Sequence, residues 1–251
     1  MKFSTVVKRL IPKSLDLPLR YYYKRLTGTL DFELTVLRDE SPNCSVAIDI
    51  GTNIGIYSYG FSRFCKRVES FEPVAECTRM LKAYAEHREN IITIHAVGLS
   101  NQAGNVNLYV PTIAGSSTPN VGLASVNDPG GGRVVMPIVI RRLDDYNFAH
   151  VDIIKVDVEG HELEVLEGSV ETILREKPLL LVEIEQRHLK GRTIEDVFGF
   201  ILSLGYSGGY YFKKRYYPLE SFSYEIHQKP FLENVFSSGY INNFIFRPIE
   251  K

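Results

Sequence analysis

Short apolar segments alternate with amphipathic ones from residue 45 onward. Each apolar segment is six or seven residues long and most are rich in β-branched residues, which predicts strands rather than buried helices. The segments are SVAIDI (45–50), RVESFE (67–72), IITIHAV (91–97), VDIIKVD (151–157) and PLLLVEI (178–184). Continuous apolar runs of this kind are typical of strands that are covered on both faces, as in parallel sheets.

Helical periodicity lies between these strands. Residues 73–87 begin with Pro73, a residue favoured at a helix start, and carry an apolar stripe. Residues 159–177 carry a second stripe, formed by Leu163, Leu166, Val170 and Ile173 or Leu174. The alternation of strand and helix implies right-handed crossovers and predicts an α/β fold with a mostly parallel sheet and helices on both faces.

The two ends of the chain differ from its middle. Residues 1–26 contain seven Lys or Arg and one acid, which leaves 22 basic and 29 acidic residues for the remainder. We expect residues 1–44 to form a basic extension and residues 45–251 to form one domain. Residues 1–26 either pack on that domain as a helix, interrupted by Pro12 and Pro18, or touch an anionic membrane surface. Near the C-terminus, residues 193–206 read as a helix, and residues 208–220 and 240–248 each read as a strand.

Composition narrows the class of protein. A chain of 251 residues with 44% hydrophobic residues can bury a large core, and a net charge of -1 argues against nucleic acid as a partner. The odd number of cysteines, Cys44, Cys65 and Cys77, predicts reduced thiols and a cytoplasmic protein. No secretory signal and no run long enough to span a membrane is visible in the sequence.

A glycine-containing turn follows the first strand. Asp49 closes the strand, Gly51 leaves room for a ligand over the turn, and Gly55 lets the following helix lie close to the sheet. Asn53 tolerates a positive φ and can stand in for a third glycine. The order D-x-G-x-N-x-G lacks both the dinucleotide fingerprint and the Gly-Lys-Ser/Thr ending of a phosphate loop. Pyrophosphate binding is therefore not indicated, and a turn without a ligand remains the alternative.

Glu72 ends the second strand, 23 residues after Asp49. An acid at about this spacing binds the ribose hydroxyls in Rossmann-like sheets. The alternative is that Glu72 only stabilises the start of the following helix. A glycine turn and a spaced acid together indicate a nucleoside without phosphates, and S-adenosylmethionine fits that description.

Acids and histidines follow the strands at 151–157 and 178–184. Asp157 and Glu159 follow one of them, and Glu183 and His188 lie at or beyond the end of the next. Because the carboxyl ends of parallel strands meet at one edge, these side chains are expected to share a cleft, with Glu183 and Glu185 on one face. There they could orient a hydroxyl, accept its proton or hold a divalent cation. His161 reads more simply as a surface residue.

Together these segments resemble the FkbM family of S-adenosylmethionine-dependent methyltransferases. The resemblance runs through DIGTNIGIYS, SFEP, AVGLSNQAG, RRLDDYNFAHVDIIKVDVEGHELEVLEGS and KPLLLVEI, over about residues 45–188. It implies a Rossmann-like class I methyltransferase fold of about seven strands and methylation of hydroxyl oxygens on sugars and related metabolites. His161 stands where small residues are frequent in the family.

The resemblance also assigns roles to residues. Asp49, Gly51, Asn53 and Gly55 would line the methionine and ribose side of the cofactor, together with Thr52 of the same turn. Glu72 would hold the ribose hydroxyls, and Asp157, Glu159 and Glu183 would lie near the transferred methyl group.

For the chemistry, Asp157 is expected to orient the acceptor, and His188 is a candidate base because its ordinary pKa lies near neutrality. Alternatively, Asp157, Glu183 and His188 ligate Mg²⁺ or another divalent ion. Residues 111–133, rich in Gly, Pro and Ser, either cover the site or form a disordered excursion from the domain.

Two classes of function follow. The first is an O-methyltransferase that acts on a small-molecule or glycan acceptor. The second is a non-catalytic binding protein of the same fold that docks on the inner face of the membrane through residues 1–26.

Overall fold

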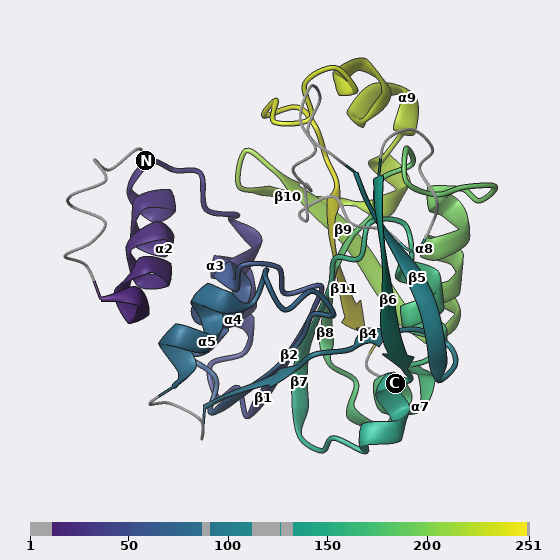
Figure 1. The fold of residues 1–251 in the computed structure, drawn as a ribbon. Coiled ribbons are helices and arrows are strands. Elements are labelled where there is room, and N and C mark those ends of the chain that lie inside the picture. The colour runs from purple at the N-terminus through teal and green to yellow at the C-terminus, as the bar shows by residue number, and fades with distance from the viewer. Residues whose placement is uncertain (1–11, 87–90, 112–125, 127–132, 250–251) are drawn as a thin grey trace.

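The central element is an eight-stranded sheet in a computed structural model that describes residues 12–86, 91–111, 126 and 133–249 (Figure 1). Its strands are ordered β10-β9-β11-β8-β7-β1-β2-β3. Their bounds are β1 Val46–Ile50, β2 Arg67–Phe71, β3 Ile92–His95, β7 Val151–Val156, β8 Leu179–Glu183, β9 Tyr206–Phe212, β10 Arg215–Pro218 and β11 Asn243–Pro248. The five strands expected between residues 45 and 184 are all present.

Parallel pairing dominates the middle of the sheet. β1 pairs in parallel with β2 and β7, and the outer pairs β2–β3 and β7–β8 are parallel as well. β11, β9 and β10 add an antiparallel edge. The single strand expected over residues 208–220 is wrong, because Lys213 and Lys214 both adopt positive φ and turn the chain into the hairpin β9–β10.

Helices cover both faces, as predicted. One layer contains the short turn Lys13–Leu15 and the helices α2 Asp16–Leu26, α3 Glu33–Glu40, α4 Ile56–Phe61 and α5 Arg79–Ala85. The other contains α6 Glu162–Glu167, α7 Val170–Glu176 and α8 Ile194–Ser203. Side chains alternate across β1, so that Ala47 packs under the first layer and Ile48 and Ile50 pack under the second.

Two predicted helices have different bounds in the structure. The helix expected from Pro73 begins only at Arg79, because Val74 and Cys77 turn aside to pack against a second, smaller sheet. The helix expected over residues 159–177 is divided into α6 and α7 at Gly168. A Cβ on Gly168 would lie 2.0 Å from the carbonyl oxygen of Ser100, so this close approach interrupts the helix.

The smaller sheet was not predicted. It contains β4 Gly98–Leu99, β5 Gly104–Pro111 and β6 Arg133–Arg141, in the order β4-β6-β5. β5 and β6 are antiparallel and flank the segment that was expected to cover the site (Figure 1). Within that segment, residues 112–125 and 127–132 lie outside the described residues. Short helical segments complete the fold: Leu143–Tyr146, Leu219–Ser221, α9 Tyr224–His227 and Lys229–Phe231.

A disulfide joins Cys44 to Cys65, with 4.5 Å between their Cα atoms. The expectation of three reduced thiols is therefore wrong for this pair, and Cys77 is the buried free thiol. Cys44 precedes β1 and Cys65 precedes β2, and these parallel neighbours start side by side although 21 residues separate the two cysteines. The prediction of a cytoplasmic protein rested on reduced thiols, and the disulfide removes that support.

Among the described helices, none has the length and apolar character needed to span a membrane.

Candidate active site

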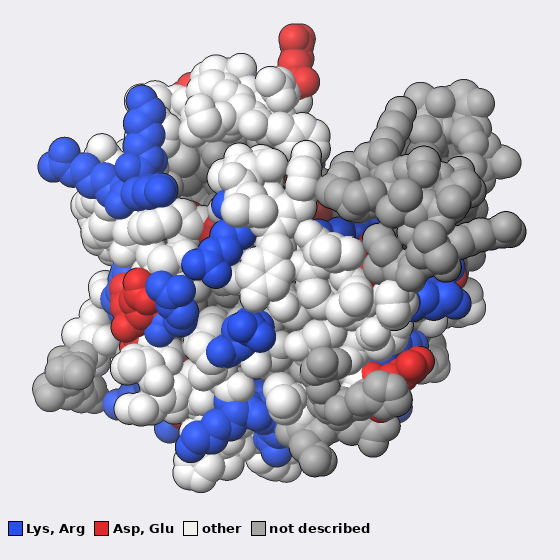
Figure 2. Space-filling model, turned by 90° about the vertical axis from the view of Figure 1, so that its left-hand side faces the viewer, with Lys and Arg blue, Asp and Glu red and all other residues white. Residues whose placement is uncertain are grey.

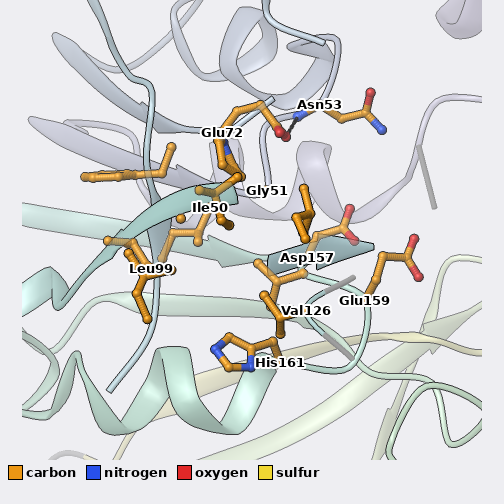
Figure 3. A pocket seen from close by; sticks show the side chains of 16 residues that line it. Ile50, Gly51, Asn53, Glu72, Leu99, Val126, Asp157, Glu159 and His161 are labelled. Carbon is orange, nitrogen blue, oxygen red and sulfur yellow. Dashed lines mark hydrogen bonds between the residues drawn. The ribbon is translucent and has the colours of Figure 1, made fainter. Parts of the chain in front are cut away.

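A pocket of about 110 Å³ lies at the carboxyl ends of β1, β2 and β7 (Figure 3). The turn after β1 and the start of the segment after β2 form one wall, and apolar side chains of the smaller sheet form another. Its lining residues are Ile50, Gly51, Asn53, Phe71, Glu72, Pro73, Gly98, Leu99, Leu108, Val126, Ile138, Ile140, Asp157, Val158, Glu159 and His161. The strand order reverses between β1 and β7, where ligands bind in open α/β sheets.

The glycine turn has the backbone conformation that its sequence requires. Gly51, Asn53 and Gly55 all have positive φ, at 78°, 51° and 93°. The contacts differ from those expected. A Cβ on Gly51 would lie 1.7 Å from the carbonyl oxygen of Asp157, so this glycine makes room for β7. A Cβ on Gly55 would lie 2.9 Å from the Cβ of Leu81, so this glycine makes room for α5 and not for the sheet.

Glu72 joins the end of β2 to this turn. Its Oε2 accepts a hydrogen bond from the backbone N–H of Asn53 at 3.0 Å, and its Oε1 accepts one from Val74 at 2.9 Å. Burial raises the pKa of Glu72, and the two backbone hydrogen bonds oppose that shift. The carboxylate that was expected to hold ribose is thus fixed at the mouth of the turn and lines the pocket.

Asp49, Thr52 and Gly55 are not among the lining residues of the pocket. Asp49 is buried and its Oδ2 accepts a hydrogen bond of 2.5 Å from Ser58 of α4. Thr52 donates its hydroxyl to the carbonyl of Asp49 at 2.8 Å. These residues hold the turn in place from behind.

Lys155 was not predicted from the sequence. It projects from β7, is 2% exposed, and donates to Asp157 Oδ2 at 2.8 Å. Burial alone would lower its pKa, but the carboxylates of Asp157, Asp49 and Glu183 outweigh burial and raise it. In the sequence, the feature that could have identified Lys155 is a single basic residue inside an apolar strand, two residues before the acid that ends it.

The four predicted catalytic residues are brought together in a second, smaller hollow beside the pocket. Asp157, Glu159, Glu183 and His188 all line it, and Asp157 and Glu159 belong to both hollows. Its other lining residues are Gly160, Glu162 and Glu185. The convergence that was expected from the neighbouring strands β7 and β8 is therefore present.

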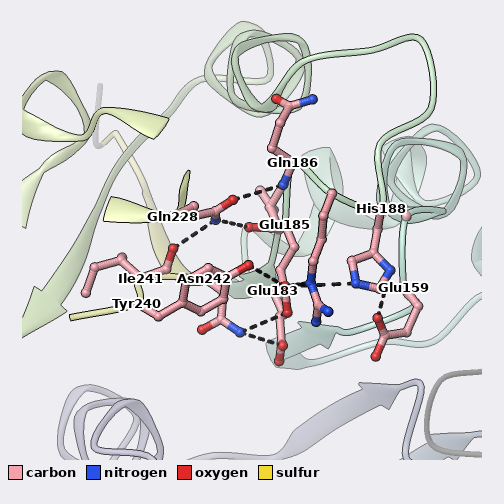
Figure 4. Close-up of polar contacts among 12 residues, drawn as sticks. Glu159, Glu183, Glu185, Gln186, His188, Gln228, Tyr240, Ile241 and Asn242 are labelled. Atoms are coloured by element: carbon pink, nitrogen blue, oxygen red, sulfur yellow. Dashed lines mark hydrogen bonds and ion pairs between the residues drawn. The ribbon is translucent and has the colours of Figure 1, made fainter. Parts of the chain in front are cut away.

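Glu159 and His188 form a pair inside this hollow (Figure 4). His188 Nδ1 lies 3.1 Å from Glu159 Oε2. Burial, with Asp157 and Glu185 nearby, raises the pKa of Glu159 to about 8. Burial and the Arg187 guanidinium lower the pKa of His188. His188 Nε2 is buried and has no hydrogen-bond partner within the described part of the chain.

Asn242, just before β11, holds two acids of the hollow (Figure 4). Its Nδ2 donates to Glu183 Oε1 at 2.7 Å and to Glu185 Oε1 at 3.3 Å, so the two acids lie close together although β8 ends at Glu183. Burial and the nearby Asp157 raise the pKa of Glu183 strongly. Burial would raise the pKa of Glu185 too, but hydrogen bonds from Arg187 and Tyr240 lower it overall.

Gln228 fixes this region, although nothing in the sequence singled it out. It is fully buried, and its Nε2 donates to the carbonyls of Ile184 and Ile241 at 2.8 and 2.9 Å. Its Oε1 accepts the N–H of Gln186 at 2.9 Å. The segments after β8 and before β11 are thereby held together.

His161 lies in the pocket wall and not at the surface. Its Nε2 is 2.9 Å from the hydroxyl of Ser100. Its Nδ1 is 3.4 Å from Glu164 Oε2. Burial lowers its pKa. The reading of His161 as a surface residue is therefore wrong.

The sequence left a divalent cation as an alternative. In the described ranges, no group of three or more acidic, histidine or cysteine side chains is arranged to hold a metal ion.

Comparison with known proteins relates this chain to a family. Residues 49–207 match the family described as the methyltransferase FkbM domain. Methyltransferase sdnD from Sordaria araneosa is 28% identical over 158 residues, which cover 51% of this chain and 61% of sdnD. Hexuronic acid methyltransferase AglP from Haloferax volcanii is 27% identical over 154 residues, which cover 60% of each chain.

The chain thus spans about three fifths of the length of the curated relatives that it matches. Among solved structures, methyltransferase FkbM from Methylobacillus flagellatus has the same fold, with a TM-score of 0.52 and 19% identity over 81% of this chain and 43% of that one. The family match covers well over half of the 251 residues, and the chain therefore belongs to the FkbM methyltransferase family.

Proposed function

We propose that this protein is an S-adenosylmethionine-dependent methyltransferase that methylates a hydroxyl oxygen of a sugar, a glycan precursor or a related metabolite. The observation that carries the proposal is the absence of basic side chains from the described lining of the pocket. Its ionisable lining residues within the described chain are Glu72, Asp157, Glu159 and His161, with neither Lys nor Arg among them. Such a lining leaves a pyrophosphate without a counter-charge, whereas a sulfonium cation needs none.

The donor suits this lining. S-adenosylmethionine carries a methyl group on a positively charged sulfur. The acceptor oxygen attacks the methyl carbon in line with the bond to sulfur. Glu72, fixed by Asn53 and Val74, would accept hydrogen bonds from the ribose hydroxyls. Phe71, Leu99 and Ile140 offer an apolar surface for the adenine ring of the donor.

The acidic hollow is the acceptor side of the proposal. Asp157, held by Lys155, would orient the acceptor hydroxyl. In the tautomer whose Nδ1–H donates to Glu159, His188 presents Nε2 as a basic nitrogen that makes no hydrogen bond within the described chain and lies 3.9 Å from Glu185 Oε2. Its lowered pKa keeps His188 neutral at pH 7, so that it can take the hydroxyl proton.

Sugars are the proposed acceptor class because several carboxyl groups and His188 line the hollow, and hydroxyl groups pair with all of them. The relative AglP is named for a hexuronic acid substrate. A divalent ion held by Asp157, Glu183 and His188 would lower the acceptor's pKa, but no step of the proposal depends on one.

Calorimetric titration with S-adenosylmethionine tests the donor. We expect binding by the full chain and about tenfold to hundredfold weaker binding by Glu72→Gln, which removes one of the carboxylate's acceptor oxygens. Glu76→Gln, an exposed acid nearby, is the matched control and should bind as the natural protein does. Absence of binding at millimolar donor would sink the proposal and favour a non-catalytic binding protein.

The substitution His188→Gln tests the base. Turnover should fall by about 10²- to 10⁴-fold while the donor's Kd stays unchanged, because His188 lies on the acceptor side. In the natural protein, turnover should rise with pH through the pKa of His188, and the variant should lose this limb. The measurement is a methylation assay across pH with a panel of sugar acceptors. An unchanged pH profile would remove His188 from the mechanism.

A further inference from the structure

Helix α2 has two apolar stripes on opposite sides. One stripe, with Leu17 fully buried and Tyr21 half-buried, faces the body and packs near Tyr59. The other runs along the outer side at helical spacing. Its members, with their exposed fractions, are Leu15 just before the helix 48%, Leu19 41%, Tyr22 39%, Tyr23 44% and Leu26 86%. Tyr22 lies at the edge of this stripe, since its ring centroid is also 6.5 Å from that of Tyr59. They are five of the fifteen exposed large apolar residues in the described chain, although they span only twelve positions.

A basic pocket adjoins this outer stripe. It has a volume of about 190 Å³ and lies where α2, α3 and the end of α4 meet. Arg25, Arg38 and Arg63, one from each of these three segments, line it together with Tyr21 and Tyr22. Burial raises the pKa of the Tyr21 hydroxyl, and the three arginines oppose that shift because they lie around the same pocket.

These guanidinium groups are largely unneutralised. Arg38 pairs with Asp39 at 2.7 Å. Within the described residues, neither Arg25 nor Arg63 has a carboxylate partner. Figure 2 views this side of the molecule, where more of the described surface is blue than red. Exposed arginines around a hollow suit the phosphate oxygens of a ligand, since guanidinium pairs with them bidentately.

We propose that this side of the protein, the outer stripe of α2 with the Arg25, Arg38 and Arg63 pocket, docks on an anionic phospholipid membrane. The leucines and tyrosines of the stripe enter the headgroup region, and the three guanidinium groups bind lipid phosphates. Charge complementarity supports this occupant: residues 12–26 hold four basic residues and one acid, whereas residues 27–251 hold 22 basic and 29 acidic residues. An amphipathic helix with a basic flank is the usual structure for this task.

The docking side and the active site are separate pockets. The basic pocket lies at the end of α4, whereas the glycine turn lies at its start, and the two share no lining residue. The proposal stands independently of the reaction, because binding to lipid needs neither donor nor acceptor.

Co-sedimentation with vesicles tests the docking. The full chain should bind vesicles of phosphatidylcholine mixed with phosphatidylglycerol and bind pure phosphatidylcholine far more weakly. Arg25→Gln with Arg63→Gln should weaken binding to the anionic vesicles by about thirtyfold, since each basic side chain at such a surface contributes a factor of about five. The control pair Lys177→Gln with Lys229→Gln removes two exposed charges elsewhere and should bind normally.

A second variant separates lipid docking from capture of a soluble anion. Leu26→Ser should lower vesicle binding by about tenfold or more, because the leucine no longer enters the headgroup region. It should leave helix content by circular dichroism unchanged. Equal binding of the natural protein to both vesicle types would overturn the proposal. Undiminished binding of the Arg25→Gln, Arg63→Gln double variant to the anionic vesicles would overturn it as well. Binding of inorganic phosphate without vesicle binding would overturn it too and would assign the pocket to a soluble phosphate.

Discussion

At the scale of single residues, Lys155 connects the two halves of the site. It lies on β7 beside Asp49 of β1 in the sheet register and forms an ion pair with Asp157 at 2.8 Å. A buried cation of this kind is stable only while its acidic partners remain, because taking it out of water costs several kcal/mol. Lys155 therefore fixes the position of Asp157, which the donor pocket and the acidic hollow share.

Lys155→Met should accordingly lower the free energy of unfolding by about 3–5 kcal/mol, because it leaves buried carboxylates without their cation. Urea unfolding followed by circular dichroism measures this. Lys66→Met, at an exposed position, is the control and should stay within about 0.5 kcal/mol of the natural protein. A loss no larger than that of the control would show that Lys155 does not hold the acids together.

Glu162 predicts a dependence of stability on pH. Burial raises its pKa from 4.5 to about 7, so the folded state keeps its proton longer than the unfolded state does. Its stabilising contribution is complete below pH 4.5 and is lost as the pH rises to about 7. Glu162→Gln should abolish this loss, which amounts to about 3 kcal/mol. Urea unfolding of both proteins between pH 4.5 and 8 measures the difference, and parallel curves would contradict it.

At the scale of elements, the disulfide ties the starts of β1 and β2 together. Replacing Cys44 and Cys65 by Ala should lower the free energy of unfolding by about 3 kcal/mol, because the unfolded chain loses a closed loop. Thermal unfolding with and without reductant checks this. Reductant should destabilise the natural protein and leave the double variant unaffected. An equal response of both proteins would show that the bond does not form.

Elements were predictable from sequence where one physical signal dominated. The five strands and α8 carry clear apolar patterns, and the structure contains them. The division at Gly168 and the late start of α5 depend on contacts with Ser100 and with the smaller sheet, which no local pattern reveals. The strand-end acids were found from their place in the pattern. Asn242 and Gln228 were missed because their partners are far away in sequence, and Lys155 was missed because its neighbours Asp49 and Glu183 come from other strands.

At the scale of the whole molecule, the donor should stabilise the fold as a unit, because the pocket draws residues from β1, β2, β7 and the smaller sheet. S-adenosylhomocysteine at about a hundred times its Kd should add about 2.7 kcal/mol and raise Tm by about 5–10 °C. A thermal-shift measurement checks this. A dinucleotide at the same concentration should leave Tm unchanged, because the described lining carries no cation for its phosphates. An equal shift with the dinucleotide would contradict the assignment of the pocket.

The approach of Gly51 to the carbonyl of Asp157 has a consequence for protein engineering. Gly51 and Asp157 touch through their backbones where the pocket adjoins the acidic hollow, and even a methyl group at Gly51 would push the segment after β7 away. Space for a larger ligand of the pocket cannot be made at this contact without displacing Asp157. Under the proposed function, redesign of donor choice therefore has to start from the opposite wall, which is lined by Leu108, Ile138 and Ile140 of the smaller sheet.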